Sequence, residues 1–326
     1  MVFKKQSDFN KFILVTYALI FDNSNGAAVA SCALMRALVS RGLAVEVLCG
    51  AMLDRDQESD LAAWLVECGW ALEERVEGGW SADAAGVRPD VPPYFRLNAD
   101  GVPVTIHRSP TTRPHEPGDE ECAEFLRLLD ATLDRFRPDV LIGYGGSRIA
   151  AEGFRRARAR GIATVFTLHN FLYRTTGPFA DVDAVAVPSR FSADFHREAL
   201  GLDCVVLPNL VDRIRVRVER GEPKYLTFVN PTPEKGVYPF ARIADELGRR
   251  RPDIPVLVVE GRGDERKLAD CGLDLKARGT VSLMSHTNDP RKFWGVTRVC
   301  LMPSLWWESQ GLVAVEAMIN NGPPDG

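Results

Sequence analysis

Short unbroken apolar runs recur along this chain, and segments with helical spacing separate them. The first run covers residues 12–21, a helical pattern covers 26–41, and a second run covers 44–49. Strands that are buried on both faces have sequences of this kind, and they occur in parallel sheets that helices cover on both sides. The opening of the chain therefore predicts a strand, a helix and a second, parallel strand.

The alternation continues to about residue 207. Further apolar runs predict strands at 140–142, 164–168, 184–187 and 205–207, and helical patterns predict helices at 119–136, 148–160 and 190–200. This order is typical of a doubly wound α/β domain, which we place at residues 1–207. Residues 78–118 are rich in Gly and Pro, so we interpret them as an insertion with a hairpin at 94–97 and 102–107. A binding loop and a surface excursion without a role are both compatible with this insertion.

A second series of strands and helices follows a charged stretch at 208–223, which we interpret as a linker. Strands are predicted at 225–229, 256–260, 281–284 and 299–302, and helices at 236–250, 290–296 and 311–320. The fold class is therefore α/β, with two tandem Rossmann-like domains that each contain a doubly wound parallel sheet, the second at 224–326. Such a pair leaves a cleft at the carboxyl ends of its strands, where these folds bind ligands.

Composition excludes several classes of function. The net charge of -4 and the absence of a dominant basic block argue against nucleic acid as a partner. Seven scattered cysteines without a C-x-x-C pair favour neither a disulfide framework nor a zinc site, and they fit the cytoplasm. No signal peptide or membrane-spanning run is recognisable. For the arginine-rich segment we expect a solvated helix face, with a weak peripheral contact to the inner face of the membrane as the alternative; its members are Arg155, Arg156, Arg158 and Arg160.

The segment 303–317 carries the most specific pattern of polar residues. A strand is predicted to end just before it and a helix to begin near Gly311, so the N–H groups of Gln310, Gly311 and Leu312 would lack helical partners. Such groups bind anions, for example a diphosphate. Glu308 would then accept hydrogen bonds from sugar hydroxyls and Glu316 from a ribose. For either glutamate alone, a helix cap or a solvated face residue is the simpler interpretation.

Lys235 lies in a second candidate segment, the loop 230–236 between a predicted strand and a predicted helix. Lysine is scarce in this chain, since only eight of the forty basic residues are lysines and none lies between Lys11 and Lys224. A lysine in such a loop suits a phosphate as a compact positive charge. By itself the Lys-Gly pair is a weak signal.

Taken together, the strings TFVNPTPEKGV, PSRFSADF, VVLPNLVD and PSLWWESQGLVAVEA resemble the family-4 group of retaining GT-B glycosyltransferases. The resemblance implies transfer of a sugar from a nucleotide sugar to an acceptor hydroxyl. It also implies that the reaction needs no cofactor and no metal ion of the kind that an Asp-x-Asp string binds. It implies that Lys235 neutralises the donor diphosphate, that Glu308 with Ser309 to Leu312 holds sugar and phosphate, and that Glu316 binds ribose. Gly26 would lie beneath the phosphates, and His169 would contact the donor sugar. A turn glycine and a structural histidine are the alternatives.

Two features depart from the pattern of this family. A Gly-Arg-Leu string usually precedes the lysine loop, whereas Val229, Asn230 and Pro231 stand at these positions here. Asn230 is therefore a candidate donor contact. Either Lys235 acts without a second cation, or Arg262 supplies the missing charge. Relatives also continue beyond the last predicted helix, where this sequence has Asn321-Gly-Pro-Pro-Asp-Gly326, so we expect an incomplete, truncated second domain with low stability.

Three other functions remain open. A sugar-nucleotide epimerase would use the same ligand contacts on the same fold. An oxidoreductase is disfavoured, because no G-x-G-x-x-G string follows the first strand. A truncated relative that only binds a sugar nucleotide is the third alternative.

Overall fold

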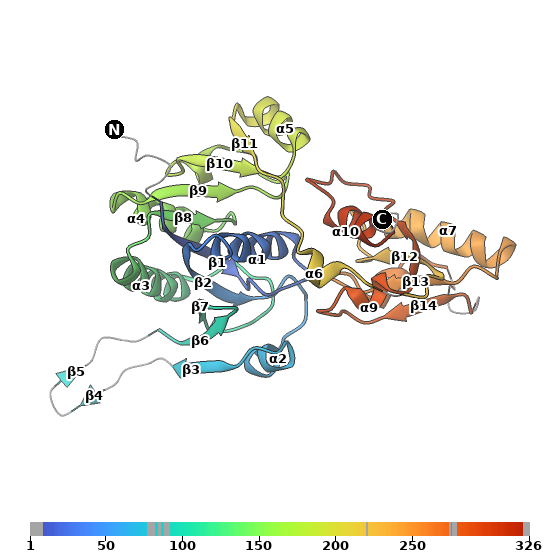
Figure 1. The fold of residues 1–326 in the computed structure, drawn as a ribbon, viewed down its shortest axis with the longest axis horizontal. Coiled ribbons are helices and arrows are strands. Elements are labelled where there is room, and N and C mark those ends of the chain that lie inside the picture. Colours follow the sequence, from blue (N-terminus) through green and yellow to red (C-terminus); the bar gives the residue numbers. More distant parts are fainter. Residues whose placement is uncertain are drawn as a thin grey trace. The chain divides into compact units, whose positions relative to one another are not determined.

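The computed structural model describes residues 9–76, 82–83, 86–87, 92–219, 221–273, 275 and 279–321. Residues 322–326, on which the expectation of an incomplete domain rests, lie outside the described residues, as does most of 77–91 in the expected insertion. The chain divides into two units by its contacts, one formed by 1–22 with 27–208 and the other by 23–26 with 209–326. Each unit is a sheet with helices on its faces (Figure 1). The predicted α/β class with two parallel-sheet domains is therefore confirmed.

The sheet of the first unit has the strand order β11-β10-β9-β8-β1-β2-β7-β6-β3. It is parallel from β11 to β7, and β6 and β3 are antiparallel to their neighbours. A short separate ladder pairs β4 (Ala82–Asp83) with β5 (Gly86–Val87). The strands of the large sheet are β1 Lys11–Ala18, β2 Ala44–Met52, β3 Leu72–Val76, β6 Tyr94–Ala99, β7 Val102–His107, β8 Val140–Gly143, β9 Ala163–Thr167, β10 Ala184–Val187 and β11 Cys204–Val206.

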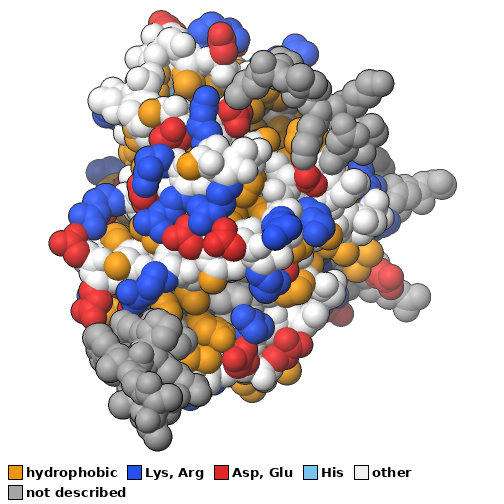
Figure 2. Space-filling model, turned by 90° about the vertical axis from the view of Figure 1, so that its left-hand side faces the viewer, with side chains coloured by type: hydrophobic (Ala, Val, Ile, Leu, Met, Phe, Trp, Pro, Cys, Tyr) orange, Lys and Arg blue, Asp and Glu red, His pale blue; other side chains and the backbone are white. Residues whose placement is uncertain are grey.

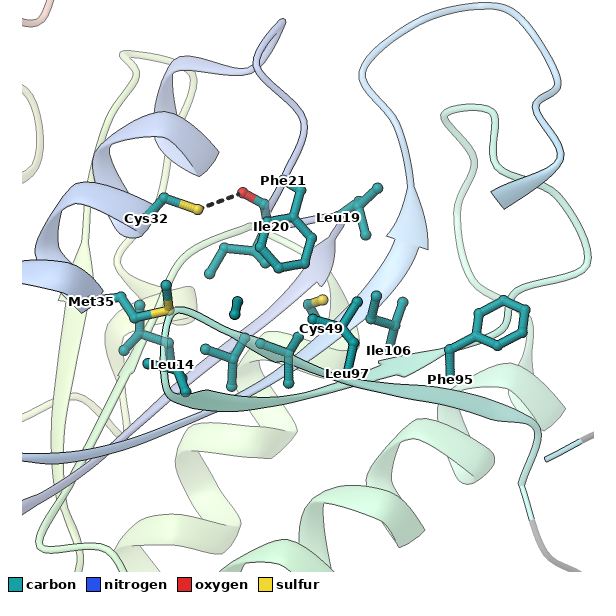
Figure 3. Close-up of a cluster of buried hydrophobic side chains, with 14 of the residues drawn as sticks. Leu14, Leu19, Ile20, Phe21, Cys32, Met35, Cys49, Phe95, Leu97 and Ile106 are labelled. Carbon is teal, nitrogen blue, oxygen red and sulfur yellow. Dashed lines mark hydrogen bonds between the residues drawn. The ribbon is translucent and has the colours of Figure 1, made fainter. Parts of the chain in front are cut away.

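Helices cover both faces of this sheet, because successive residues of each strand point to opposite sides. Leu14 of β1 joins the core beneath α1 and α2, where Cys32 donates a hydrogen bond to the carbonyl of Ile20 at 3.1 Å (Figure 3). Ile13 and Val15 join the opposite core beneath α3, α4 and α5. The helices are α1 Gly26–Val39, α2 Leu61–Glu67, α3 Asp119–Phe136, α4 Arg148–Ala159 and α5 Arg190–Leu200, with a 3₁₀ turn η2 at Gly177–Phe179.

The hairpin of the expected insertion is part of the main sheet. Its second strand, β7, pairs in parallel with β2, and β6 continues the sheet to β3. Asp100 and Gly101 form its two-residue turn, both with positive φ (54° and 88°), as the tight turns of hairpins require. The hairpin was predicted correctly, and the alternative of a surface excursion is wrong for residues 94–107, because both strands belong to the main sheet.

The second unit contains a four-stranded parallel sheet of order β14-β13-β12-β15. Val256 and Val258 of β13 face a core beneath α7 and α8, and Leu257 and Val259 face the core beneath α6, α9 and α10. The strands are β12 Tyr225–Val229, β13 Val256–Val259, β14 Val281–Met284 and β15 Thr297–Leu301, and the helices are α6 Arg213–Val216, α7 Val237–Arg250, α8 Glu265–Ala269, α9 Arg291–Trp294 and α10 Leu312–Asn321.

Residues 208–223 are not a plain linker. Val216 of α6 is buried in the core of the second unit, and Val211 and Val218 pack against the same core. The side chain of Asn320 fixes this segment, because its Oδ1 accepts the N–H of Val218 at 2.8 Å and its Nδ2 donates to the carbonyl of Val216 at 3.2 Å. Apart from Pro208 and residue 220, which is not described, the predicted linker therefore belongs structurally to the second unit.

Candidate active site

Lys235 and Glu308 meet at the carboxyl ends of two adjacent parallel strands, β12 and β15. The ammonium Nζ of Lys235 lies 2.6 Å from Glu308 Oε1, which also accepts the hydroxyl of Ser304 at 2.8 Å. The two loops are joined by their backbones as well, since Leu305 N–H donates to the carbonyl of Glu234 at 2.9 Å. The structure thus brings together the two segments that the sequence singles out.

Gly236 allows this close approach of the two loops. It has a φ of 84°, and a Cβ at this position would lie 1.9 Å from the carbonyl oxygen of Pro303. No side chain fits there, because such a contact is far inside van der Waals distance. Glycine after Lys235 is therefore a requirement of loop packing, a role that the Lys-Gly pair alone does not reveal.

The turn before α10 is formed around Gly311, whose φ of 71° lies in the left-handed region. Its carbonyl accepts the N–H groups of Ala314 and Val315, so the helix begins with the next residue. Ser309 and Leu312 flank the turn and are half-buried. The first N–H groups of a helix have no helical acceptor, and this end of α10 adjoins the Lys235–Glu308 contact through the same loop.

Gln310 has a structural role that its sequence position does not indicate. Its side-chain Oε1 accepts the N–H of Asn209 at 2.6 Å, and its Nε2 donates to the carbonyl of Asn209 at 3.1 Å. Both bonds of the amide are thus used to hold residue 209 against the turn before α10. A contribution of Gln310 to ligand binding would come from its backbone.

Glu316 lies in the second turn of α10 and faces α9. Its Oε2 accepts the indole N–H of Trp294 at 3.1 Å. Burial raises the pKa of Glu316, and the bond from Trp294 opposes this effect. The alternative interpretation of Glu316 as a solvated face residue is therefore wrong.

Asn230 and Arg262 lie on neighbouring loops at the carboxyl ends of β12 and β13. Asn230 has a positive φ of 62°, and its Oδ1 accepts the N–H of Gly263 at 3.0 Å. The loops touch so closely that a Cβ on Gly263 would lie 2.1 Å from the carbonyl oxygen of Pro231. The side-chain oxygen of Asn230 is thus used within the fold, and Arg262 is exposed beside it.

Gly26 begins α1, and the short segment Asn23–Gly26 belongs to the second unit by its contacts. Asn23 donates from Nδ2 to the carbonyl of Asn288 at 3.1 Å. A Cβ on Gly26 would lie 3.9 Å from Leu312 Cδ1, which is ordinary contact. Gly26 therefore lies next to the start of α10, but the Cβ of an alanine would fit in the described surroundings.

His169 lies in the first unit, two residues after β9. Neither ring nitrogen has a hydrogen-bond partner in the described part of the chain, and both are buried. Burial lowers the pKa of His169 to about 4, so the imidazole is neutral at pH 7. The ring of Tyr144 packs edge-on against it at 6.0 Å. Buried polar atoms usually have partners, so unsatisfied nitrogens at a strand end mark a position where a ligand can supply them.

The first unit also contains a polar cluster that the sequence did not indicate. Glu121 of α3 accepts hydrogen bonds from the hydroxyl of Tyr17 and from His115 Nε2, the latter at 2.9 Å. Tyr17 also contacts the hydroxyl of Ser109 at 3.1 Å. His115 Nδ1 lies 2.9 Å from the carbonyl of Arg113, so the ring must be doubly protonated to donate both bonds.

The pKa values in this cluster follow from these contacts. Burial lowers the pKa of His115, but the hydrogen bonds to Arg113 and Glu121 outweigh burial and raise it overall. Burial likewise raises the pKa of Glu121, but the bonds from Tyr17 and His115 lower it overall. Ser109 also lines a cavity of about 190 Å³ at the carboxyl ends of β2 and β7. Four scattered residues form the cluster, so no sequence motif predicts it.

The charged surface of α4 is balanced by acidic neighbours. Lys and Arg side chains alternate with Asp and Glu on the side of the molecule that carries α3 and α4 (Figure 2). The ion pairs are Arg155 with Glu152, Arg156 with Asp130, Arg158 with Asp183, and Arg160 with Asp134. These pairs favour the solvated helix face over a lipid contact. Among the described residues, no helix is both long and apolar enough to cross a membrane.

Two Asp-x-Asp strings occur in the chain, at Asp54–Asp56 and Asp181–Asp183. Asp56 is paired with Arg113, and Asp183 Oδ2 accepts the N–H and the hydroxyl of Thr164 at 2.9 and 3.0 Å. One carboxylate of each string, that of Asp56 and that of Asp183, therefore takes part in contacts within the first unit.

Several solved structures share this fold at low sequence identity. Staphylococcus aureus TarM is 11% identical, with a TM-score of 0.60 over 95% of this chain and 83% of its own. Anabaena HepE, solved with UDP and glucose, is 14% identical, with a TM-score of 0.60 over 96% and 79%. The pneumococcal O-GlcNAc transferase GtfA, solved with UDP and GlcNAc, is 10% identical, with a TM-score of 0.57 over 96% and 82%.

Comparison with curated protein sequences gives no match. The family model of Glycosyltransferase Family 4, in contrast, matches residues 24–215, which is more than half of the chain. The solved structures share the two-domain arrangement known as GT-B. The chain therefore belongs to glycosyltransferase family 4, has the GT-B fold, and is of the transferase class that moves glycosyl groups.

Proposed function

We propose that this protein transfers a sugar from a nucleotide sugar to an acceptor hydroxyl, without a metal ion and with retention of the anomeric configuration. The contact between Lys235 and Glu308 carries this proposal. It brings together a cation that can bind phosphate and a carboxylate that can bind sugar hydroxyls, next to the start of α10. The nucleotides and sugars in the HepE and GtfA structures support the choice of donor.

Lys235 would stabilise the leaving group. As the bond between the anomeric carbon and the phosphate oxygen breaks, both electrons stay with the diphosphate, whose negative charge grows. The ammonium of Lys235 and the N–H groups at the start of α10 are fixed donors, and preorganised donors aimed at developing charge are usually the largest source of catalysis. Lys235 is only 27% exposed, so water screens this charge less than at an open surface.

Glu308 would hold the sugar. Its Oε1 accepts bonds from Lys235 and Ser304, and its Oε2 has no partner within the described residues. The second oxygen is thus able to accept a sugar hydroxyl while the first keeps Lys235 in place. The acceptor hydroxyl would attack the face that the diphosphate leaves and pass its proton to the departing phosphate oxygen, as the family resemblance implies.

His169 is a further candidate contact of the transferred sugar. Its buried nitrogens without partners support this role, and its lowered pKa favours a neutral ring that can both donate and accept one hydrogen bond. A His169→Phe variant that keeps wild-type turnover would contradict the assignment.

Donor binding can be tested by melting the protein with UDP, GDP, ADP and their glucose and GlcNAc derivatives, in EDTA and in Mg²⁺. One class of nucleotide should raise the melting temperature in EDTA, and Lys235→Ala should reduce the rise, because weaker binding gives less stabilisation. Lys292→Ala, an exposed lysine on α9, is the matched control. Stabilisation by none of these ligands, or only with Mg²⁺, would contradict the proposal. Formation of an epimer of the sugar nucleotide without an acceptor, detected by NMR because epimers have the same mass, would identify an epimerase instead.

A further inference from the structure

Trp294 is a buried residue whose indole N–H makes a hydrogen bond to a carboxylate. It ends α9, is 2% exposed, and packs in the core of the second unit beside Phe293, with ring centroids 4.8 Å apart. Its indole N–H donates to Glu316 Oε2 at 3.1 Å. A buried indole N–H needs an acceptor, and a carboxylate is a strong one.

Glu316 has few other groups around it that favour its charged form. Burial raises its pKa, and the Trp294 bond is the contact that lowers it. Burial raises the pKa of the Cys300 thiol of β15, and the nearby charge of Glu316 raises it further. The basic side chains of the helices packed nearby are exposed: Arg291 and Lys292 of α9, and Arg213 and Arg215 of α6.

The two oxygens of Glu316 therefore differ. Oε2 is bound by Trp294, whereas Oε1 has no hydrogen-bond partner within the described part of the chain. A carboxylate anchored at one oxygen is fixed in orientation, and its other oxygen can accept a ligand hydroxyl without first losing rotational freedom.

We infer that Trp294 is a positioning residue, which holds Glu316 so that its second oxygen recognises the ribose hydroxyls of the nucleotide. This inference rests on the proposed function, since it requires that a nucleotide binds. Trp294 lies 22 residues before Glu316 in a separate helix, and the string that carries Glu316 does not include it.

The ratio of two affinities tests this role. Calorimetry would compare the nucleoside diphosphate that binds among UDP, GDP and ADP with its 2′,3′-dideoxy counterpart. Trp294→Phe keeps an aromatic ring but removes the N–H, and it should reduce the preference for the ribose form by about tenfold, the size of a hydrogen bond to a charged group. Phe293→Leu disturbs the same core without removing a polar contact, so it should lower the melting temperature and keep the preference.

A double variant separates an effect through Glu316 from a general one. Glu316→Gln should reduce the preference as well, and adding Trp294→Phe to it should change the ratio no further, because both changes act on the same contact. An unchanged ratio in Trp294→Phe, or an equal loss in Phe293→Leu, would overturn the inference while the proposed function stands. If wild type binds none of the three diphosphates, the proposed function fails, and this inference with it.

Discussion

Replacing Gly236 by alanine tests whether the contact between the two loops determines the site. The new Cβ would lie 1.9 Å from the carbonyl oxygen of Pro303. A real Cβ keeps at least 3.0 Å from such an atom, so the loops must separate by 3.0 - 1.9 = 1.1 Å or more. Lys235 precedes this position directly, and its contact with Glu308 would open by a similar distance.

The cost of this movement has two parts. Alanine with a φ of 84° carries about 1–2 kcal/mol of left-handed strain. A misplacement of roughly 1 Å in a catalytic group lowers turnover by about a hundredfold. Gly272→Ala is the matched control, because its φ is 68° and no atom lies within 4 Å of the added Cβ. It should lose stability through strain alone.

The assay combines unfolding in guanidinium chloride with the rate of sugar release from the nucleotide sugar that stabilises wild type. Gly236→Ala should lose more stability than Gly272→Ala and about a hundredfold in rate, whereas Gly272→Ala should keep the wild-type rate. If both variants lose the same stability and both remain active, the packing of Gly236 against Pro303 does not hold the site, and the reasoning is refuted.

Three further predictions follow from the contacts described. Lys235→Ala should weaken diphosphate binding by about tenfold or more. In a Glu308→Gln background the same change should reduce the affinity less, because the two side chains are coupled. Equal losses of affinity in the two backgrounds, measured by calorimetry, would contradict this. His115→Gln should destabilise the protein more at pH 5.5 than at pH 9. The raised pKa of His115 contributes stability that is complete below the pKa of the unfolded state and is lost as pH rises through the pKa of the folded state, while Glu121 stays ionised because its pKa is lowered. Denaturant unfolding that gives the same loss of stability at both pH values would disprove this. Phe240→Ala should lower the free energy of unfolding by about 3–5 kcal/mol, because its fully buried ring stacks on the ring of Phe228 with centroids 4.3 Å apart. A decrease below about 1 kcal/mol in urea unfolding would show that the core refills the space.

Much of the fold could be predicted because its strands are local apolar runs. The predicted strand at 225–229 and the helix at 119–136 match β12 and α3 residue for residue. The place of β7 beside β2 could not be predicted, because strand pairing depends on contacts between residues far apart in sequence. α6 was missed for a similar reason: its four residues have no helical period, and its structure depends on the burial of Val216 and the bonds from Asn320.

The site shows the same division. Sequence indicated that Lys235 and Glu308 belong together, and the parallel order of β12 and β15 explains why their loops meet. It gave no sign that the side chain of Gln310 holds Asn209 or that Asn230 holds Gly263, because the partners in these bonds are backbone groups. Trp294 was missed because an apolar core position predicts packing and not the direction of one N–H group.

The assignment of Asn23–Gly26 to the second unit means that the polypeptide passes between the units at three points: after Asp22, after Gly26 and after Pro208. A chimera that exchanges only residues 209–326 would join a foreign α10 to the native segment that contacts Leu312 and Asn288. Recombination between relatives should therefore succeed more often when residues 23–26 are exchanged together with residues 209–326. Pairs of chimeras that differ only in which relative residues 23–26 come from would show how much this segment contributes to the stability of the chimera.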